Sequence, residues 1–200
     1  SSDVVLMPPD VKLVELTAAG MREPRADWTE TATKNVRQAL RNELAERGAQ
    51  MISYRPADDP VQVVREEHQQ LVKLHGAVGN TILVHGYRPA YSLPTKPEDG
   101  LDWTLGNGVA RLREDYDADY ALFVHYRDAF STPGRVALIA TAAVFGVSVP
   151  GGQQVGFASL VDLESGDVAW FTRLQSGFGD LRDSELARRS VDALLDEAPL

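Results

Sequence analysis

The sequence predicts an α/β fold, more exactly an α+β sandwich in which a mixed β-sheet is flanked by amphipathic helices. Segments with helical periodicity alternate with short apolar or alternating segments, a pattern typical of helices packed on a sheet. No glycine-rich turn follows the first strand, which disfavours a doubly wound nucleotide-binding fold. The expected order is β-α-β-α-α-β-β-β-α in one domain over residues 1–200. A loop insertion is expected near 87–102 and an uncharged apolar segment at 136–149.

The first elements are a broken strand and a long helix. Residues 4–16 predict a strand that Pro8 and Pro9 interrupt, and because proline cannot donate to a ladder we expect this step at an edge or a bulge. Asp27 is the expected N-cap of the next helix, with Glu30 completing a capping box. Gly48 is expected to end that helix in the left-handed conformation.

Two further helices surround the loop insertion. A short strand over 50–54 precedes a helix from about residue 61, which we expect to continue towards Val84 because Gly76 and Gly79 weaken a helix without ending it. Its apolar stripe includes His68 and His75. Thr104 is the expected cap of the third helix.

The C-terminal half predicts the centre of the sheet and its last helix. Residues 119–126 are strongly apolar and predict a central strand, and 155–163 pairs with 168–174 in a hairpin whose turn contains Gly166. The last helix is capped near Asp183 or Ser184. Its expected apolar face comprises Leu186, Ala187, Val191, Leu194 and Leu195.

Composition excludes several functional classes. The chain has 20 basic and 29 acidic residues, a net charge of -9, so it lacks the basic footprint of a nucleic-acid binder. It contains no cysteine, which excludes thiolate catalysis, zinc–thiolate sites and disulfides. Because the net charge is acidic, a nucleic-acid partner is not expected.

No motif for catalysis or metal binding is complete in the sequence. His68 and His75 lie too far apart on their helix to share a metal easily, so we expect hydrogen-bonded, partly buried histidines. Residues 115–119 imitate the start of a calcium loop, but Tyr120 and Tyr126 stand where glycine and glutamate are needed. Ser159 is not in a nucleophile elbow. We expect no catalytic residue, no cofactor and no metal.

The uncharged stretch is the most unusual feature of the sequence. Residues 136–161 carry no charge, and Pro150-Gly151-Gly152 within them argues against one continuous membrane helix. The pattern of 136–149 leaves helix and strand equally open. We expect a buried segment or an interaction surface, with interfacial membrane contact as the weaker alternative. The residues expected on such a surface are Val144, Phe145, Val147 and Val149, with Phe178 as an addition.

Four stretches carry a resemblance to a known group of proteins. They are the helix over 28–47, residues 104–106 before a helix, the strand 118–124, and the hairpin 158–171 with its DxxSGxxxW pattern. Together they resemble the small α/β domain of bacterial envelope lipoproteins. That group includes the curli-secretion (CsgG-like) family, the penicillin-binding-protein activators and the N-terminal domain of TolB, and the pattern does not assign the branch.

The resemblance implies a periplasmic, non-enzymatic domain that binds a protein partner or self-associates. It also implies tethering to a membrane, such as the outer membrane, through an upstream lipid anchor. The alternative is a hydrolytic or small-ligand-binding domain with a cleft centred on His125, assisted by Tyr126, Tyr87 or a nearby carboxylate. A His125 ring packed flat beneath a helix would exclude that alternative.

Overall fold

The structure is a computed structural model that describes residues 3–48, 51–54, 62–95, 101–149, 151–176 and 180–200. The strands are β1 (Val4–Leu6), β2 (Asp10–Leu16), β3 (Arg22–Pro24), β4 (Met51–Ser53), β5 (Tyr120–Ser131), β6 (Gln154–Asp162) and β7 (Val168–Ser176). The helices are α1 (Ala26–Glu46), α2 (Gln62–His85), α3 (Ala110–Tyr116), α4 (Pro133–Val144) and α5 (Ser184–Leu195). Short 3-10 turns lie at Pro89–Tyr91 and Asn107–Val109. The predicted α/β class is confirmed.

The long strand β5 organises a mixed, seven-stranded sheet. On one side it pairs antiparallel with β6, which pairs antiparallel with β7. On its other side it pairs in parallel with two strands in succession, β1 through Val4↔Tyr120 and β2 through Asp10↔His125. Strand β4 extends the sheet beyond β1, and β3 extends it beyond β2.

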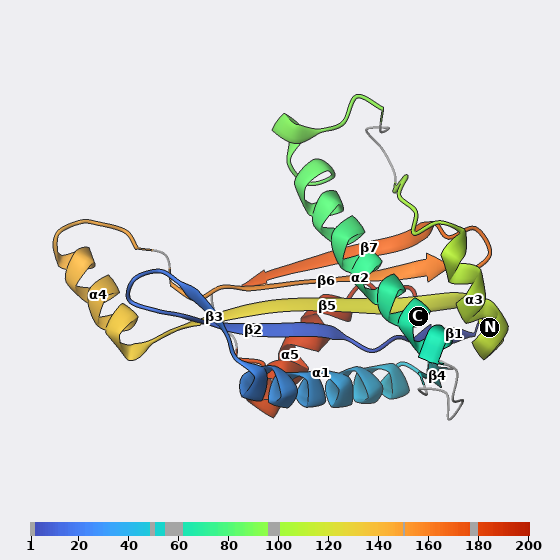
Figure 1. Ribbon diagram of the computed structural model, residues 1–200, viewed down its shortest axis with the longest axis horizontal. Coiled ribbons are helices and arrows are strands. Elements are labelled where there is room, and N and C mark those ends of the chain that lie inside the picture. The colour runs from blue at the N-terminus through green and yellow to red at the C-terminus, as the bar shows by residue number, and fades with distance from the viewer. Residues whose placement is uncertain (1–2, 49–50, 55–61, 96–100, 150, 177–179) are drawn as a thin grey trace.

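Helices cover both faces of the sheet and give two separate apolar cores (Figure 1). One core packs α1 and α5 against alternate residues of β2 and β5, including Leu13, Val36 and Val191. The other packs α2 and α3 on the opposite face around Phe123 and Phe157. Each fully buried aliphatic or aromatic side chain contributes roughly 1.5–3 kcal/mol, so both faces must be covered for stability.

Several predicted elements are confirmed. The helix α2 runs through Gly76 and Gly79, the central strand is β5, and the β6–β7 hairpin turns at Gly166, whose φ is +83°. Gly48 follows α1 with a φ of +67°. Asp183 caps α5 by accepting hydrogen bonds from the backbone N–H groups of Glu185 and Leu186 at 2.9 Å.

The ends of two helices differ from the prediction. The helix α1 begins earlier than expected, with Arg25 as its N-cap, so Asp27 lies in the first turn and pairs with Arg25. Thr104 forms an isolated bridge with Asp167 because its segment joins the edge of the hairpin, and the helix α3 starts only at Ala110. Leu186, expected on the buried face of α5, is exposed because it lies in the first turn, beside the cap.

The structure also shows the conformation of the Pro8-Pro9 step and of the uncharged segment 136–149. Pro8 and Pro9 separate β1 from β2, which both pair with the same side of β5. Between Leu6↔Leu122 and Asp10↔His125 the first strand holds one residue more than β5, so the expected bulge is confirmed. Most of the uncharged segment is the helix α4, inserted between β5 and β6. The observed order therefore differs from the predicted one by the short β3 and by one more helix, α4, whereas the break in the first strand was predicted.

Candidate interaction surface and polar core

The helix α4 forms an exposed apolar projection at one end of the sheet (Figure 1). Phe145 and Val144 have relative exposures of 78% and 81%, and Val147 one of 55%. Val149 is half-buried, and Phe178 lies outside the described residues. Val136 and Leu138, which were not singled out from the sequence, are also exposed. We call the exposed side chains of residues 136–147 the tip surface.

The sequence of α4 explains why the helix is ordered at both ends. The Thr132 hydroxyl accepts a hydrogen bond from the backbone N–H of Arg135 at 3.2 Å, and Pro133 occupies the first turn, where its missing N–H costs nothing. Gly146 has a φ of +73°, and the N–H of Val147 returns to the carbonyl of Ala142. Such a left-handed end satisfies carbonyls that the helix leaves free.

One narrow stripe of α4 faces the rest of the chain. Arg135, Ile139 and Ala142 are buried or half-buried, and their spacing places them on one side of the helix. The Arg135 guanidinium donates to the carbonyl of Thr17. The remaining sides expose uncharged residues, whereas a helix in contact with water normally carries polar ones.

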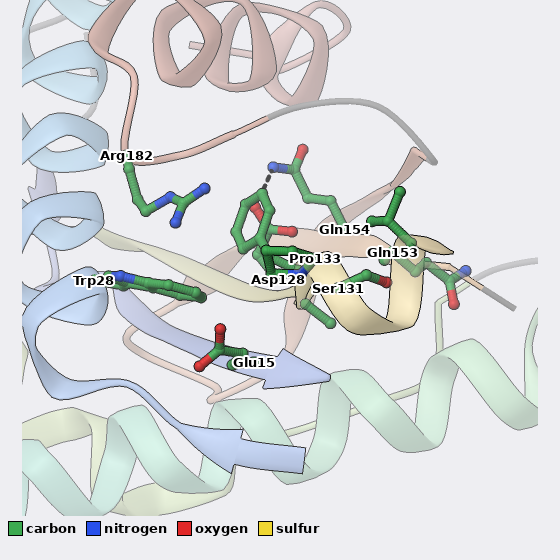
Figure 2. A pocket seen from close by; sticks show the side chains of 12 residues that line it. Glu15, Trp28, Asp128, Ser131, Pro133, Gln153, Gln154 and Arg182 are labelled. Carbon is green, nitrogen blue, oxygen red and sulfur yellow. Dashed lines mark hydrogen bonds between the residues drawn. The ribbon is translucent and has the colours of Figure 1, made fainter. Parts of the chain in front are cut away.

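A polar pocket of about 450 Å³ lies at the root of α4 (Figure 2). Within it the Arg182 guanidinium lies 4.3 Å from the ring centre of Trp28 and 4.1 Å from that of Phe130. Asp180 holds the same guanidinium by two charge-assisted hydrogen bonds of 2.7 and 2.8 Å. This arginine is therefore fixed in place and fills part of the pocket.

Asp128 forms the buried polar wall of this pocket. Burial raises the pKa of its carboxyl to about 6, although hydrogen bonds such as that from the Gln154 amide at 3.1 Å oppose the shift. Gln154 in turn accepts a hydrogen bond from the Ser190 hydroxyl, which connects the pocket to α5. No local pattern in the sequence indicates Asp128, because its burial arises from elements distant in the chain.

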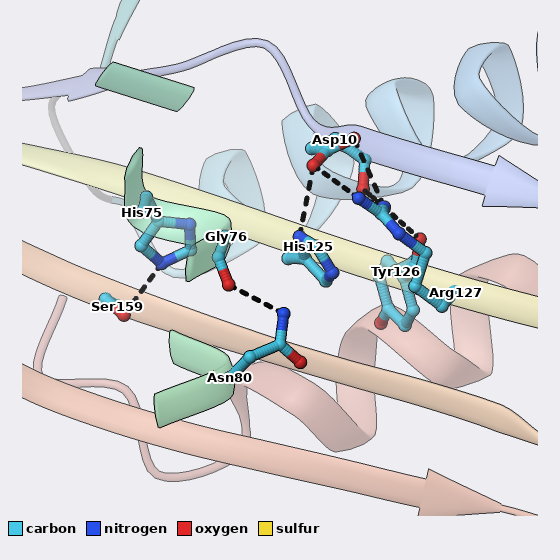
Figure 3. Close-up of polar contacts among 8 residues, drawn as sticks. All are labelled: Asp10, His75, Gly76, Asn80, His125, Tyr126, Arg127 and Ser159. Carbon is cyan, nitrogen blue, oxygen red and sulfur yellow. Dashed lines mark hydrogen bonds and ion pairs between the residues drawn. The ribbon is translucent and has the colours of Figure 1, made fainter. Parts of the chain in front are cut away.

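His125 contacts a carboxylate but lies inside the core (Figure 3). Its Nδ1 lies 3.1 Å from Oδ2 of Asp10, which Arg127 also holds at 2.7 Å. Its ring stacks on Phe157 at 4.3 Å between centroids with an interplanar angle of 12°, and a Cβ placed on Gly76 of α2 would lie only 3.1 Å from it. The ring is thus packed flat beneath α2, the arrangement that excludes a catalytic cleft.

The side chains of the tyrosines predicted to assist His125 contact other residues. Tyr126 points to the opposite face of the sheet, where its hydroxyl donates to the carbonyl of Ser190 at 3.0 Å. Tyr87 stacks beneath Arg173 and near Phe171. The His125-centred cleft predicted as an alternative is therefore wrong.

The charges around His125 offset one another. Burial favours a raised pKa for the Asp10 carboxyl, but the interactions with His125 and Arg127 outweigh it and hold that pKa well below its usual range. Burial is also the main reason that the pKa of His125 is lowered, with Asp10 partly opposing the shift. At neutral pH the cluster is a neutral imidazole beside an arginine–carboxylate pair.

A second buried pair joins His75 of α2 to Ser159 of β6 (Figure 3). Nε2 of His75 lies 2.8 Å from the Ser159 hydroxyl, and both residues are almost fully buried. Burial, with a smaller effect of His125, lowers the pKa of His75 to about 3. A substrate has no access to this hydroxyl. The sequence predicted a buried, hydrogen-bonded His75 but not its partner, 84 positions away.

The other two histidines also have structural partners. His68 contacts the Tyr54 hydroxyl and the carboxylate of Asp115, both at 3.2 Å. His85, in the last turn of α2, contacts the carbonyl of Tyr91 at 2.6 Å. Within the described part of the chain, no three metal-ligating side chains are grouped around a common point. The helices described there also include none that is both long and apolar enough to span a bilayer.

No family model matches the sequence, and no curated protein matches it. Among solved structures the chain is similar to lipoprotein GNA1162 from Neisseria meningitidis, with 11% identity, full coverage of both chains and a TM-score of 0.39. It is also similar to the LpoB C-terminal domains from Salmonella enterica and Escherichia coli. Both are 12% identical over 88% of this chain, and cover 82% and 83% of theirs, with TM-scores of 0.32 and 0.35. At such TM-scores and identities these similarities carry no argument about family or function.

Proposed function

We propose that this chain is a non-catalytic domain of the bacterial cell envelope that assembles with further copies of itself through the tip surface. The observation that carries the proposal is the exposure of an uncharged helix, capped at both ends, with Val144 and Phe145 at its far end. An exposed apolar projection of this kind marks a contact site.

Charge favours a second copy as the occupant of the tip surface. The chain carries a net charge of -9, so two copies repel each other over most possible contacts. Residues 136–149 contain no charged side chain, and two copies can therefore approach here without bringing acidic groups together. Small residues of α4 such as Ala137, Ala140 and Thr141 allow close helix-to-helix approach.

The geometry of α4 is also better suited to protein than to lipid. A helix of 12 residues is about 18 Å long, too short to cross a bilayer core of roughly 30 Å. Helices that lie in a membrane interface usually carry lysine or arginine on one face, and α4 carries only the buried Arg135.

The test of assembly is the solution mass by light scattering over a wide range of protein concentration. We expect an oligomer that Phe145→Asp shifts towards the monomer, with an unchanged circular dichroism spectrum. Tyr91→Asp is the matched control, because Tyr91 is 59% exposed and lies on the 3-10 turn after α2, away from the tip. A monomer at every concentration, or an oligomer that Phe145→Asp leaves intact, would overturn the proposal.

A vesicle experiment separates the membrane alternative from self-assembly. Flotation of the wild-type chain with neutral phosphatidylcholine vesicles, abolished by Phe145→Asp, would make the tip surface a lipid contact and overturn the assembly proposal. Absence of flotation together with a concentration-dependent mass supports it.

The envelope location and the lipid tether rest on the sequence resemblance and need their own measurement. We expect the product of the complete gene, expressed in its own bacterium, to fractionate with the envelope. Mass spectrometry of its N-terminus should then find a lipid-modified residue upstream of this domain. A product recovered in the cytoplasmic fraction without a lipid would refute this part of the proposal alone.

A further inference from the structure

A second hollow lies beside α2, far from the tip surface. It has a volume of about 250 Å³, and its lining includes Pro8, Pro9, Lys12, Tyr54, Val72 and Lys73. It opens where Pro8 and Pro9 separate β1 from β2, so the gap in the sheet is itself part of the lining. We call it the proline groove.

The lining of the proline groove is mainly apolar. The half-buried Val72 and Tyr54 supply apolar surface, and the two proline rings add more. A space of this size holds roughly eight water-sized groups. A short aliphatic chain therefore fits it in volume and polarity.

The uncompensated charge at the groove is positive. Lys12 and Lys73 are exposed, and neither makes an ion pair or hydrogen bond with another residue in the part of the chain that the structure describes. Asp10, the one carboxylate among the described residues of the lining, is already paired with Arg127 at 2.7 Å and contacts His125 at 3.1 Å (Figure 3). Two free ammonium groups thus border an apolar hollow on a chain that is acidic as a whole.

We propose that the proline groove binds a medium-chain aliphatic carboxylate, with the chain against Pro8, Pro9 and Val72 and the carboxylate between Lys12 and Lys73. Burial of the chain supplies apolar contact, at about 0.8 kcal/mol per buried CH₂ group. The lysines select the sign of the head group, because a local positive potential attracts anions even when the net charge is negative. The groove lies beside the middle of β5, whereas the tip surface lies beyond its end, so this proposal does not rest on self-assembly.

The test is a titration of the whole chain with sodium octanoate below micelle-forming concentrations, followed by backbone amide NMR. We expect saturable shifts confined to residues of the groove, with at least tenfold weaker binding of octylamine, which has the same chain and the opposite charge. Acetate, which has the charge without the chain, should also bind at least tenfold more weakly.

Variants of the two lysines complete the test. The double variant Lys12→Ala/Lys73→Ala should weaken octanoate binding tenfold or more while keeping the wild-type melting temperature, because both side chains are exposed. Lys34→Ala is the matched control, since Lys34 is an exposed lysine on α1, which packs on the other face of the sheet. Equal binding of octanoate and octylamine, shifts scattered outside the groove, or no saturation would each overturn the proposal. Tighter binding of an acidic peptide than of octanoate would also overturn it, because it would make the groove a peptide site.

Discussion

Gly79 of α2 lies directly against the ring of Phe157 in β6, so closely that a Cβ at this glycine would collide with three ring carbons. The ring has no space to move away. It is fully buried and stacks on His125 at 4.3 Å and on Phe171 at 5.7 Å between centroids. The absence of a side chain at Gly79 therefore sets how closely α2 approaches the sheet.

Gly79→Ala should destabilise the chain even though alanine favours a helix by about 1 kcal/mol relative to glycine. Overpacking a rigid core costs about 1–3 kcal/mol, so we expect a net loss measurable by urea denaturation. Gly134→Ala in α4 is the control, because the Cβ there would be 3.8 Å from its nearest neighbour, an ordinary contact. A Gly79→Ala chain at least as stable as wild type would show that α2 can move away from the sheet.

Asp128→Asn should change the dependence of stability on pH. The folded state raises the pKa of Asp128 from 3.8 to about 6, so between these values the folded state holds a proton that the unfolded state has released. Its contribution to the free energy of unfolding is therefore full below pH 4 and falls by up to about 3 kcal/mol as the pH rises past 6. Arg182 and Asp180 are the charged groups nearby, and Gln154 donates to the carboxyl.

The asparagine variant cannot ionise but can still accept the hydrogen bond from Gln154. Its stability relative to wild type should therefore increase from pH 4 to pH 7 in urea denaturation. Asp192→Asn, an exposed change on α5, should leave the difference constant. Parallel curves for wild type and Asp128→Asn would contradict the raised pKa.

His75→Gln should also change the dependence of stability on pH, but in the opposite direction to Asp128→Asn: its stability relative to wild type should increase as the pH falls. The folded state lowers the pKa of His75 from 6.5 to about 3, so below pH 6.5 the unfolded state takes up a proton that the folded state excludes. Wild-type stability therefore loses about 2 kcal/mol from this group between pH 6.5 and 5. His125 contributes in the same direction, and Asp10 partly opposes the shift of His75.

Glutamine can still donate to the Ser159 hydroxyl but does not titrate in this range. We expect His75→Gln to be less stable than wild type at pH 7, because the imidazole that stacks on Phe123 at 5.0 Å is lost. On acidification the variant should then lose less stability than wild type loses. An unchanged slope in His75→Gln would place the acid sensitivity elsewhere.

Local signals in the sequence predicted most of the fold. Helical stripes located α1, α2 and α5, and the uninterrupted apolar residues of 119–126 located the centre of the sheet. The segment 136–149 could not be assigned, because an uncharged stretch has no polar side from which to read a period. The structure resolves most of it as a helix, and Val136, Leu138 and Val144 of that helix remain exposed, a case in which hydrophobicity does not indicate burial.

The polar interior was predictable only in part. His68 and His75 were expected to be buried because they lie on an apolar stripe, but their partners come from other elements. Asp10 and His125 meet because β2 pairs in parallel with β5, a register that neither strand encodes by itself. The same limit applies to the pocket at the root of α4, which combines β2, β5, the start of α1 and Arg182.

Asp183 and Asp27 look equally suited to cap a helix in the sequence, but only Asp183 does so. Its carboxylate accepts two backbone N–H groups at the start of α5, whereas Asp27 lies inside the first turn of α1 and pairs with Arg25. Asp183→Ala should therefore cost about 1 kcal/mol in chemical denaturation, the usual cost of losing an N-cap. Asp27→Ala should cost clearly less, because its exposed ion pair is screened by water and salt. Equal losses for the two variants would mean that α1 begins at Asp27 in solution, as the capping-box pattern alone predicted.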